Sequence, residues 1–198
     1  QNKPETLTCT GVRRTLALAG SAMECRYAQG DTIHGVSMSP NLNDIREAAQ
    51  RIKPYAHRTP VLTNESLSQQ VGARVFLKCE NLQKVGAFKF RGACNAVYSL
   101  SEEGAARGVC THSSGNHAAA LALAAKMRGI PAYIVMPNNA PSVKKNAVGG
   151  YGGQITFCEP TLEARESTLD RIRLGTGANV VHPYNDERVI AGQGTAAL

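Results

Sequence analysis

Residues 108–128 read GVCTHSSGNHAAALALAAKMR. The apolar run Gly108-Val109-Cys110 leads into a polar turn from Thr111 to His117, and an alanine-rich segment follows. This order predicts a strand, a tight turn and a helix. A helix N-terminus presents unpaired backbone N–H groups and the positive end of its dipole, so the turn suits an anionic group. An ordinary helix N-cap explains the same residues, and both interpretations stay open here.

A second segment, residues 80–93, reads ENLQKVGAFKFRGA and places Lys89 between Phe88 and Phe90. Desolvation by neighbouring aromatic rings disfavours the ammonium form of a lysine and lowers its pKa. A lysine with a lowered pKa is an amine nucleophile, and proteins use such an amine to form Schiff bases with aldehyde cofactors. The alternative is that both phenylalanines belong to the core and that Lys89 reaches out to solvent between them.

Strand and helix patterns alternate from Arg74 onward. Strands are expected at about residues 75–78, 109–111, 132–135, 155–158 and 180–181. Helices are expected at about residues 88–100, 116–128, 142–148 and 162–173, with an earlier one near 41–53 and a last one within 189–198. This alternation predicts an α/β fold with an open parallel sheet covered by helices. Ligands of such sheets bind at the carboxyl ends of the strands. The polar turn from Thr111 to His117, which we call the serine turn, lies at such an end.

Together these segments resemble the fold-type II pyridoxal-phosphate enzymes, which have a tryptophan synthase β-like fold, in the branch of serine racemase and threonine or serine dehydratase. The resemblance runs from about Ser39 to Leu198. Its other motifs are Arg58-Thr59-Pro60-Val61, residues 129–137, Tyr151-Gly152-Gly153, His182-Pro183-Tyr184-Asn185 and Gly192-Gln193-Gly194-Thr195. Several separate motifs in the same order are more specific than any one of them.

The resemblance implies pyridoxal 5'-phosphate as cofactor and two catalytic residues. Lys89 would form the Schiff base and act as the base on one face of the substrate α-carbon, and Ser114 would be the base on the opposite face. The implied reactions are racemisation of serine and β-elimination of water from serine or threonine, which gives a 2-keto acid and ammonia. Both reactions share one carbanion, and the sequence does not set the ratio between them.

The resemblance also implies binding residues. Phe88, Asn116 and Tyr184 would contact the cofactor, with Asn116 at the ring hydroxyl. The substrate carboxylate would be held by Ser113, Ser114, Gly115, Asn116 and His117, largely through backbone N–H groups. The implied partners are a small amino-acid substrate and, in the full-length enzyme, a second copy of the chain in a homodimer.

Enzymes of this family are longer than this chain, so we interpret the 198 residues as a fragment that lacks the C-terminal half of the large domain. The glycine-rich phosphate loop and the ligands of a divalent cation (Mg²⁺ or Ca²⁺ in the full-length enzyme) would lie in the absent half. Residues 149–153, GGYGG, are interpreted as a structural turn between a helix and a strand. The alternative function is an inactive fragment or a non-catalytic binding remnant.

The expected domain organisation has three parts. Residues 1–37 form an extension that is either a targeting remnant or non-native sequence, residues 39–104 and 186–198 form part of the large cofactor-binding domain, and residues 107–183 form the small α/β domain. The expected location is cytoplasmic, with organellar targeting by residues 1–37 left open.

Composition excludes several other classes. The net charge is +7, but the cations are scattered with no aromatic-interleaved stripe, which argues against nucleic acid. No segment is long enough to cross a membrane, and no nucleotide-binding glycine motif occurs. The six cysteines have no zinc-ligand spacing, so no metal site is expected. His57 and His182 have no obvious partners for a metal site.

Overall fold

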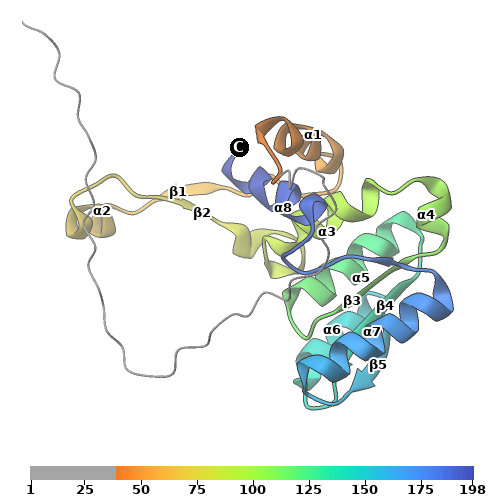
Figure 1. Cartoon of the computed structure of the whole chain (residues 1–198). Helices are drawn as coiled ribbons and strands as arrows, with labels where there is room; N and C mark the ends of the chain where they lie inside the picture. Colours follow the sequence, from red (N-terminus) through yellow and green to blue (C-terminus); the bar gives the residue numbers. More distant parts are fainter. Residues whose placement is uncertain (1–38) are drawn as a thin grey trace, which may run out of the picture. The chain divides into compact units, whose positions relative to one another are not determined.

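The computed structural model describes residues 39–198, which belong to one compact unit (Figure 1). The extension predicted for residues 1–37 lies outside the described residues. Within residues 39–198 no helix is long and apolar enough to span a membrane.

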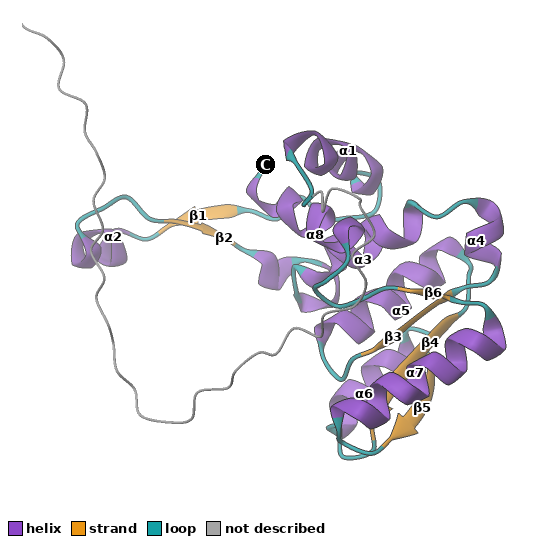
Figure 2. Ribbon diagram, in the orientation of Figure 1, coloured by secondary structure: helices purple, strands orange, loops and turns teal. Residues whose placement is uncertain are grey.

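A four-stranded parallel sheet forms the centre of the α/β part, with strand order β5-β4-β3-β6 (Figure 2). Its strands are β3 (Val109–His112), β4 (Ala132–Pro137), β5 (Gln154–Cys158) and β6 (Asn179–Val180). Its helices are α5 (Asn116–Arg128), α6 (Ser142–Gly150) and α7 (Leu162–Thr176). β3 is a central strand, with β4 and β6 as its parallel neighbours.

Alternate residues of the central strands enter two separate cores. Val109 belongs to the core that contains Leu121 of α5, whereas the next residue, Cys110, belongs to the core that contains Leu169 of α7. Successive side chains of a strand point to opposite faces, so the sheet is covered by helices on both sides. This arrangement confirms the predicted α/β class with a parallel, helix-covered sheet.

A helical layer carries the segment around Lys89. Its members are α1 (Leu42–Ile52), α3 (Lys89–Tyr98), α8 (Glu187–Gly194) and the short η3 (Thr195–Ala197). α3 is buried from Phe90 to Val97. Its Gly92 lies against α8, where a Cβ on Gly92 would come within 2.7 Å of the Val189 carbonyl oxygen. Only glycine allows the two backbones to approach this closely.

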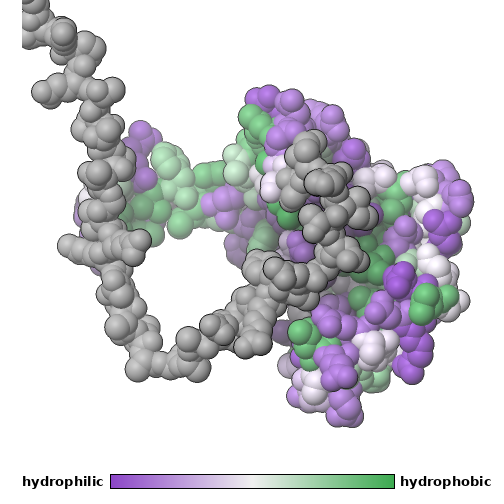
Figure 3. Space-filling view, viewed as in Figure 1, coloured by the Kyte–Doolittle hydropathy of each residue, from purple (hydrophilic) through white to green (hydrophobic). Residues whose placement is uncertain are grey.

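A two-stranded antiparallel ribbon extends away from these helices (Figure 1). It consists of β1 (Val61–Thr63) and β2 (Phe76–Lys78), joined by α2 (Glu65–Val71). We call these three elements the arm. Every residue of both strands is exposed and α2 buries none, so the arm has no core within the described residues. Figure 3 shows hydrophobic surface along it.

The secondary structure predicted from the sequence matches most of these elements. The helix predicted for residues 116–128 is α5 itself, and the other predicted helices and strands agree with the structure to within a few residues. The missed elements are β1, α2, α4 (Glu102–Ala106), η1 (Glu80–Leu82) and η2 (Lys84–Gly86). Residues 149–150 end α6 and residues 151–153 form the turn to β5, which agrees with the interpretation of this segment as a structural turn. The division into a large and a small domain stays a prediction.

Candidate active site

Lys89 is the first residue of α3, and a strained turn precedes it. Val85 has φ +57° and Gly86 has φ +68°, both in the left-handed region. A β-branched residue rarely adopts this conformation, and such strain is typical of functional sites. The turn lies just before α3, and Lys89 is the half-buried first residue of an otherwise buried helix.

The amine of Lys89 lies in a partly apolar environment. Its Nζ is 5.4 Å from the centre of the Phe88 ring, and it donates a 2.7 Å hydrogen bond to the backbone oxygen of Pro183. Desolvation by burial lowers the pKa of Lys89 from its ordinary value. A lysine with a lowered pKa has more of the neutral amine that attacks an aldehyde.

The serine turn connects β3 to α5 without a side-chain cap. Gly115 is the N-cap residue and has no side chain, and the first turn of α5 contains no acidic residue. The turn itself is held by Ser113, whose backbone N–H donates to the Val135 oxygen and whose Oγ accepts from the Gly115 N–H. Free N–H groups at the head of a 13-residue helix therefore suit a carboxylate.

The segment that follows β6 joins these two features. β3 and β6 are parallel neighbours, so their carboxyl ends lie at the same edge of the sheet. The backbone oxygen of Val181 lies 3.1 Å from Nε2 of His117 in the first turn of α5, and two residues later the Pro183 oxygen receives Lys89. The Lys89 amine and the first turn of α5 are thus both hydrogen-bonded to backbone oxygens of residues 181–183.

His117 is buried and neutral. Because a carbonyl oxygen only accepts, Nε2 carries the hydrogen, and the buried Nδ1 has no partner within the described residues. Burial lowers the pKa of His117 to about 4, and the positive charge of Lys89 acts in the same direction. His117 therefore positions the first turn of α5 and carries no charge near neutral pH.

The other predicted site residues lie around this centre. The Phe88 ring is 44% exposed beside Lys89, Ser114 is half-buried in the turn, and Asn116 is exposed at the head of α5. Tyr184 is 71% exposed, and its ring packs edge-on against His182 with 4.4 Å between centroids. The structure thus groups Lys89 with Phe88, and it connects Lys89 to Tyr184 through Pro183.

A buried ion pair anchors the other side of α3. Arg91 makes two 2.8 Å hydrogen bonds to the carboxylate of Glu80, and Thr59 donates to the same carboxylate at 2.6 Å. Burial raises the pKa of Glu80, but the hydrogen bonds from Arg91 and Thr59 and the neighbouring cations outweigh it and hold the pKa below its usual value. This pair fixes α3 two residues after Lys89.

Sequence reasoning named residues 182–185 as a motif but missed the backbone contacts made by the segment after β6. Val181 and Pro183 act through backbone oxygens, which no residue type reveals. The sequence also did not reveal that Gln83 binds the backbone of His57 or that Nδ1 of His182 accepts two backbone N–H groups. A polar side chain directly before a proline in a loop is the signal that could have indicated a turn at His182.

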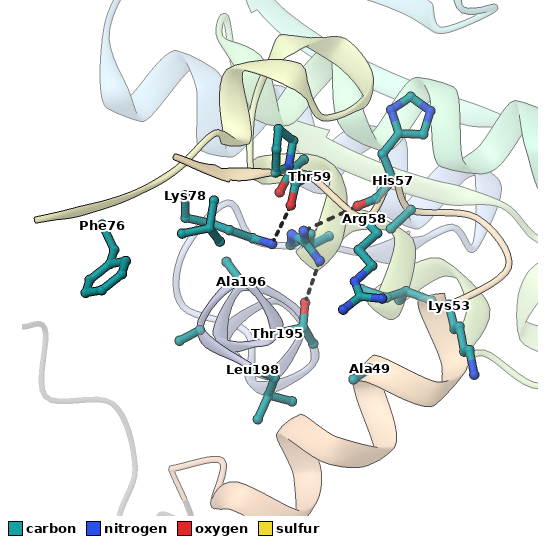
Figure 4. A pocket seen from close by; sticks show the side chains of 16 residues that line it. Ala49, Lys53, His57, Arg58, Thr59, Phe76, Lys78, Thr195, Ala196 and Leu198 are labelled. Carbon is teal, nitrogen blue, oxygen red and sulfur yellow. Dashed lines mark hydrogen bonds between the residues drawn. The ribbon is translucent and has the colours of Figure 1, made fainter. Parts of the chain in front are cut away.

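A cavity of about 790 Å³ lies elsewhere, between α1, the base of the arm and η3 (Figure 4). Cationic side chains line it, among them Lys53, Arg58 and Lys78, and Lys78 donates to the Thr59 backbone oxygen at 2.9 Å. None of the predicted site residues lines this cavity. Across residues 39–198 no three His, Cys, Asp or Glu side chains are grouped as metal ligands.

Residues 52–198 match the model of the family described as "Pyridoxal-phosphate dependent enzyme". The chain belongs to this family. Members of a family with this description need an amine for the cofactor aldehyde, and the partly desolvated Lys89 fits that requirement. The uncapped head of α5 fits the carboxylate of an amino acid.

Several relatives agree with this assignment. The chain is 61% identical to the serine racemase of Arabidopsis thaliana over 154 residues, which cover 78% of this chain and 46% of the relative. It is 54% identical to the beta-hydroxyaspartate dehydratase of Paracoccus denitrificans over 158 residues, which cover 80% and 50%. The crystal structure of serine racemase from Dictyostelium discoideum has a TM-score of 0.78 and 51% identity, and the match covers 81% of this chain and 52% of that one.

These pyridoxal-phosphate dependent relatives confirm the fold-type II class predicted from the sequence. The chain spans about half the length of the curated relatives it matches. The roles assigned to individual site residues stay predictions.

Proposed function

We propose that this chain carries the amine and the carboxylate-binding turn of an enzyme that racemises serine or removes water from a 3-hydroxy amino acid such as serine or threonine. The observation that carries the proposal is Lys89, a partly desolvated amine beside the Phe88 ring in a chain of this family. Relatives named serine racemase and beta-hydroxyaspartate dehydratase support both reactions.

Lys89 and Ser114 would move the proton. Bound pyridoxal phosphate withdraws electrons from the α-carbon of an attached amino acid, which acidifies its C–H bond. Lys89 Nζ would remove or return the α-proton on one face, for which a lowered pKa is an advantage near neutral pH. The Ser114 hydroxyl would return a proton on the opposite face and so invert the configuration. Loss of the β-hydroxyl as water competes with that return and leads to a 2-keto acid and ammonia.

The binding residues would orient the substrate. Backbone N–H groups from Ser113 to His117 would hold its carboxylate at the head of α5, where the helix dipole favours negative charge. Phe88 would cover the cofactor and exclude water. Asn116 would contact the cofactor from the start of α5, and Tyr184 would contact it from the loop after β6. A homodimer, a cytoplasmic location and a divalent cation held by residues outside this chain stay predictions of the resemblance.

The test is covalent trapping of pyridoxal phosphate on the chain with borohydride, followed by peptide mass mapping. The label should lie on Lys89 in the wild type and in the control variant Lys84→Ala, since Lys84 also lies near an aromatic ring, 5.5 Å from the centre of Phe90. Lys89→Ala should lose it. Product assays with L-serine for D-serine and pyruvate then separate racemisation from elimination. Equal, scattered labelling of Lys89→Ala and wild type would overturn the role of Lys89.

A further inference from the structure

The loop after β6 is held by one imidazole nitrogen. Nδ1 of His182 accepts a hydrogen bond from the backbone N–H of Asn185 at 2.9 Å and another from that of Tyr184 at 3.3 Å. Both donors need a lone pair, so Nδ1 is unprotonated and the neutral ring carries its hydrogen on Nε2. His182 therefore does for this turn what an Asn or Asp oxygen does in an Asx-turn.

The turn held in this way presents the acceptor of Lys89. Pro183 lies between His182 and the two donors, and its backbone oxygen receives the Lys89 ammonium at 2.7 Å. Proline has no N–H with which to fix its own position, so its carbonyl direction depends on its neighbours. The His182 ring supplies the bonds that close the turn around it.

Charged and titratable groups face His182 from several elements. They are His112 of β3, Glu166 of α7, Lys89 of α3, His117 of α5, and Tyr184 and Asp186 of its own loop. Burial is the main cause that lowers the pKa of His182, and the charge of His112 acts in the same direction. The carboxylates of Asp186 and Glu166 oppose that shift. The lower pKa favours the neutral ring, which is the form that the turn requires.

We propose that His182 is a positioning residue: its Nδ1 holds the turn at residues 182–185 so that the Pro183 carbonyl keeps the Lys89 amine in place. That this amine is the reactive one rests on the proposed function. That His182 holds the turn rests on the hydrogen bonds alone. Loss of the Nδ1 acceptor releases the turn, and Lys89 then loses a partner that stabilises its charged form.

Two variants separate this role from simple packing. His182→Asn keeps an acceptor for N–H groups two and three residues ahead, whereas His182→Ala has none. Hydrogen exchange of the Tyr184 and Asn185 amides, measured without cofactor, should be at least about tenfold faster in His182→Ala and close to wild type in His182→Asn. Amides of β4 provide the internal standard for intact folding.

Competitive acetylation reports on Lys89. The rate at Lys89 should rise in His182→Ala because its ammonium has lost an acceptor, and the rate at the exposed Lys144 should stay the same. Acidification should speed hydrogen exchange of the Tyr184 and Asn185 amides in the wild type, because a protonated Nδ1 no longer accepts their hydrogen bonds. His182→Asn has no group to protonate at that position, so its two amides should stay protected.

Two results would overturn the role of His182. One is wild-type protection of both amides in His182→Ala with β4 intact, and the other is the same acid-induced increase in exchange in His182→Asn as in wild type. Trapping of pyridoxal phosphate distinguishes the two proposals. If borohydride labels no Lys89 while the amides respond as expected, the positioning role stands and the proposed function fails.

Discussion

α3 and the arm contain similar apolar residues in opposite environments. Phe90 of α3 is completely buried, whereas Phe76 of the arm is 57% exposed, and Val61 and Leu62 beside it are more than half exposed. Within the described residues α3 packs against α5 and α8, whereas the main contact of the arm strands is with each other. Apolar composition alone therefore does not say which segment stabilises this unit.

The comparison also separates the candidate site from its surroundings. Lys89 begins the buried helix, and its partners come from the segment after β6, which the parallel sheet fixes. The arm contributes none of the predicted site residues. Apolar residues on both of its faces are a surface at risk of aggregation when they stay uncovered.

Truncation of a phenylalanine tests this contrast most strongly. Phe90→Ala should lower the free energy of unfolding by about 4 kcal/mol, because it opens a cavity in a completely buried site. Phe76→Ala should change it by less than about 1 kcal/mol, since most of that ring is already in water. Denaturant unfolding measures both. Equal losses would mean that the arm stabilises the unit as much as α3 does.

Acid should weaken the buried part through His117. Its pKa is about 4 in the folded chain against 6.5 for an unperturbed histidine, so the unfolded chain binds more protons between these values. Stability is then complete above about pH 6.5 and decreases as pH falls toward 4, by about 3 kcal/mol.

The matched controls for this pH dependence are His117→Gln and His57→Gln. The first should flatten the curve of unfolding free energy against pH, because the buried titrating group is gone. The second removes an imidazole from an exposed position and controls for the substitution itself. An unaltered slope in His117→Gln would contradict the assignment of the acid effect to this residue.

Adding one methyl group where α3 meets α8 should cost about 2 kcal/mol. In Gly92→Ala the new Cβ would meet the Val189 carbonyl oxygen at 2.7 Å, so the two helices must move apart. The control Gly149→Ala places its Cβ in open space within α6 and should be neutral or slightly stabilising. Thermal unfolding compares the two, and a neutral Gly92→Ala would show that the contact is adaptable.

The smallest effect is expected in the arm itself. Asn64 caps α2 by accepting from the Leu67 N–H at 2.8 Å. Asn64→Ala should speed hydrogen exchange of the α2 amides but change global stability by less than about 0.5 kcal/mol, because α2 buries no residue. Thr161→Ala removes the corresponding cap of α7 and should cost about 1 kcal/mol. A global loss in Asn64→Ala would show that the arm unfolds together with the rest.

Local patterns in the sequence were sufficient for the elements around the site. β3, the serine turn and α5 are consecutive in the chain, and the turn chemistry and the alanine run predict them directly. The Lys89 neighbourhood was predicted in part: Phe88 is adjacent in sequence, but Pro183 is 94 residues away and binds through its backbone. α2 and β1 were missed because short segments without buried faces have no periodic pattern.

The separation of 94 positions between Lys89 and Pro183 also matters during synthesis of the chain. A ribosome adds about 5–20 residues per second, so the lysine precedes the carbonyl that receives it by about 5–20 s. β6, which brings that carbonyl to the edge of the sheet, is the last strand of residues 39–198. A nascent chain therefore exposes an unrestrained amine first, and the carbonyl that binds this amine is made only later.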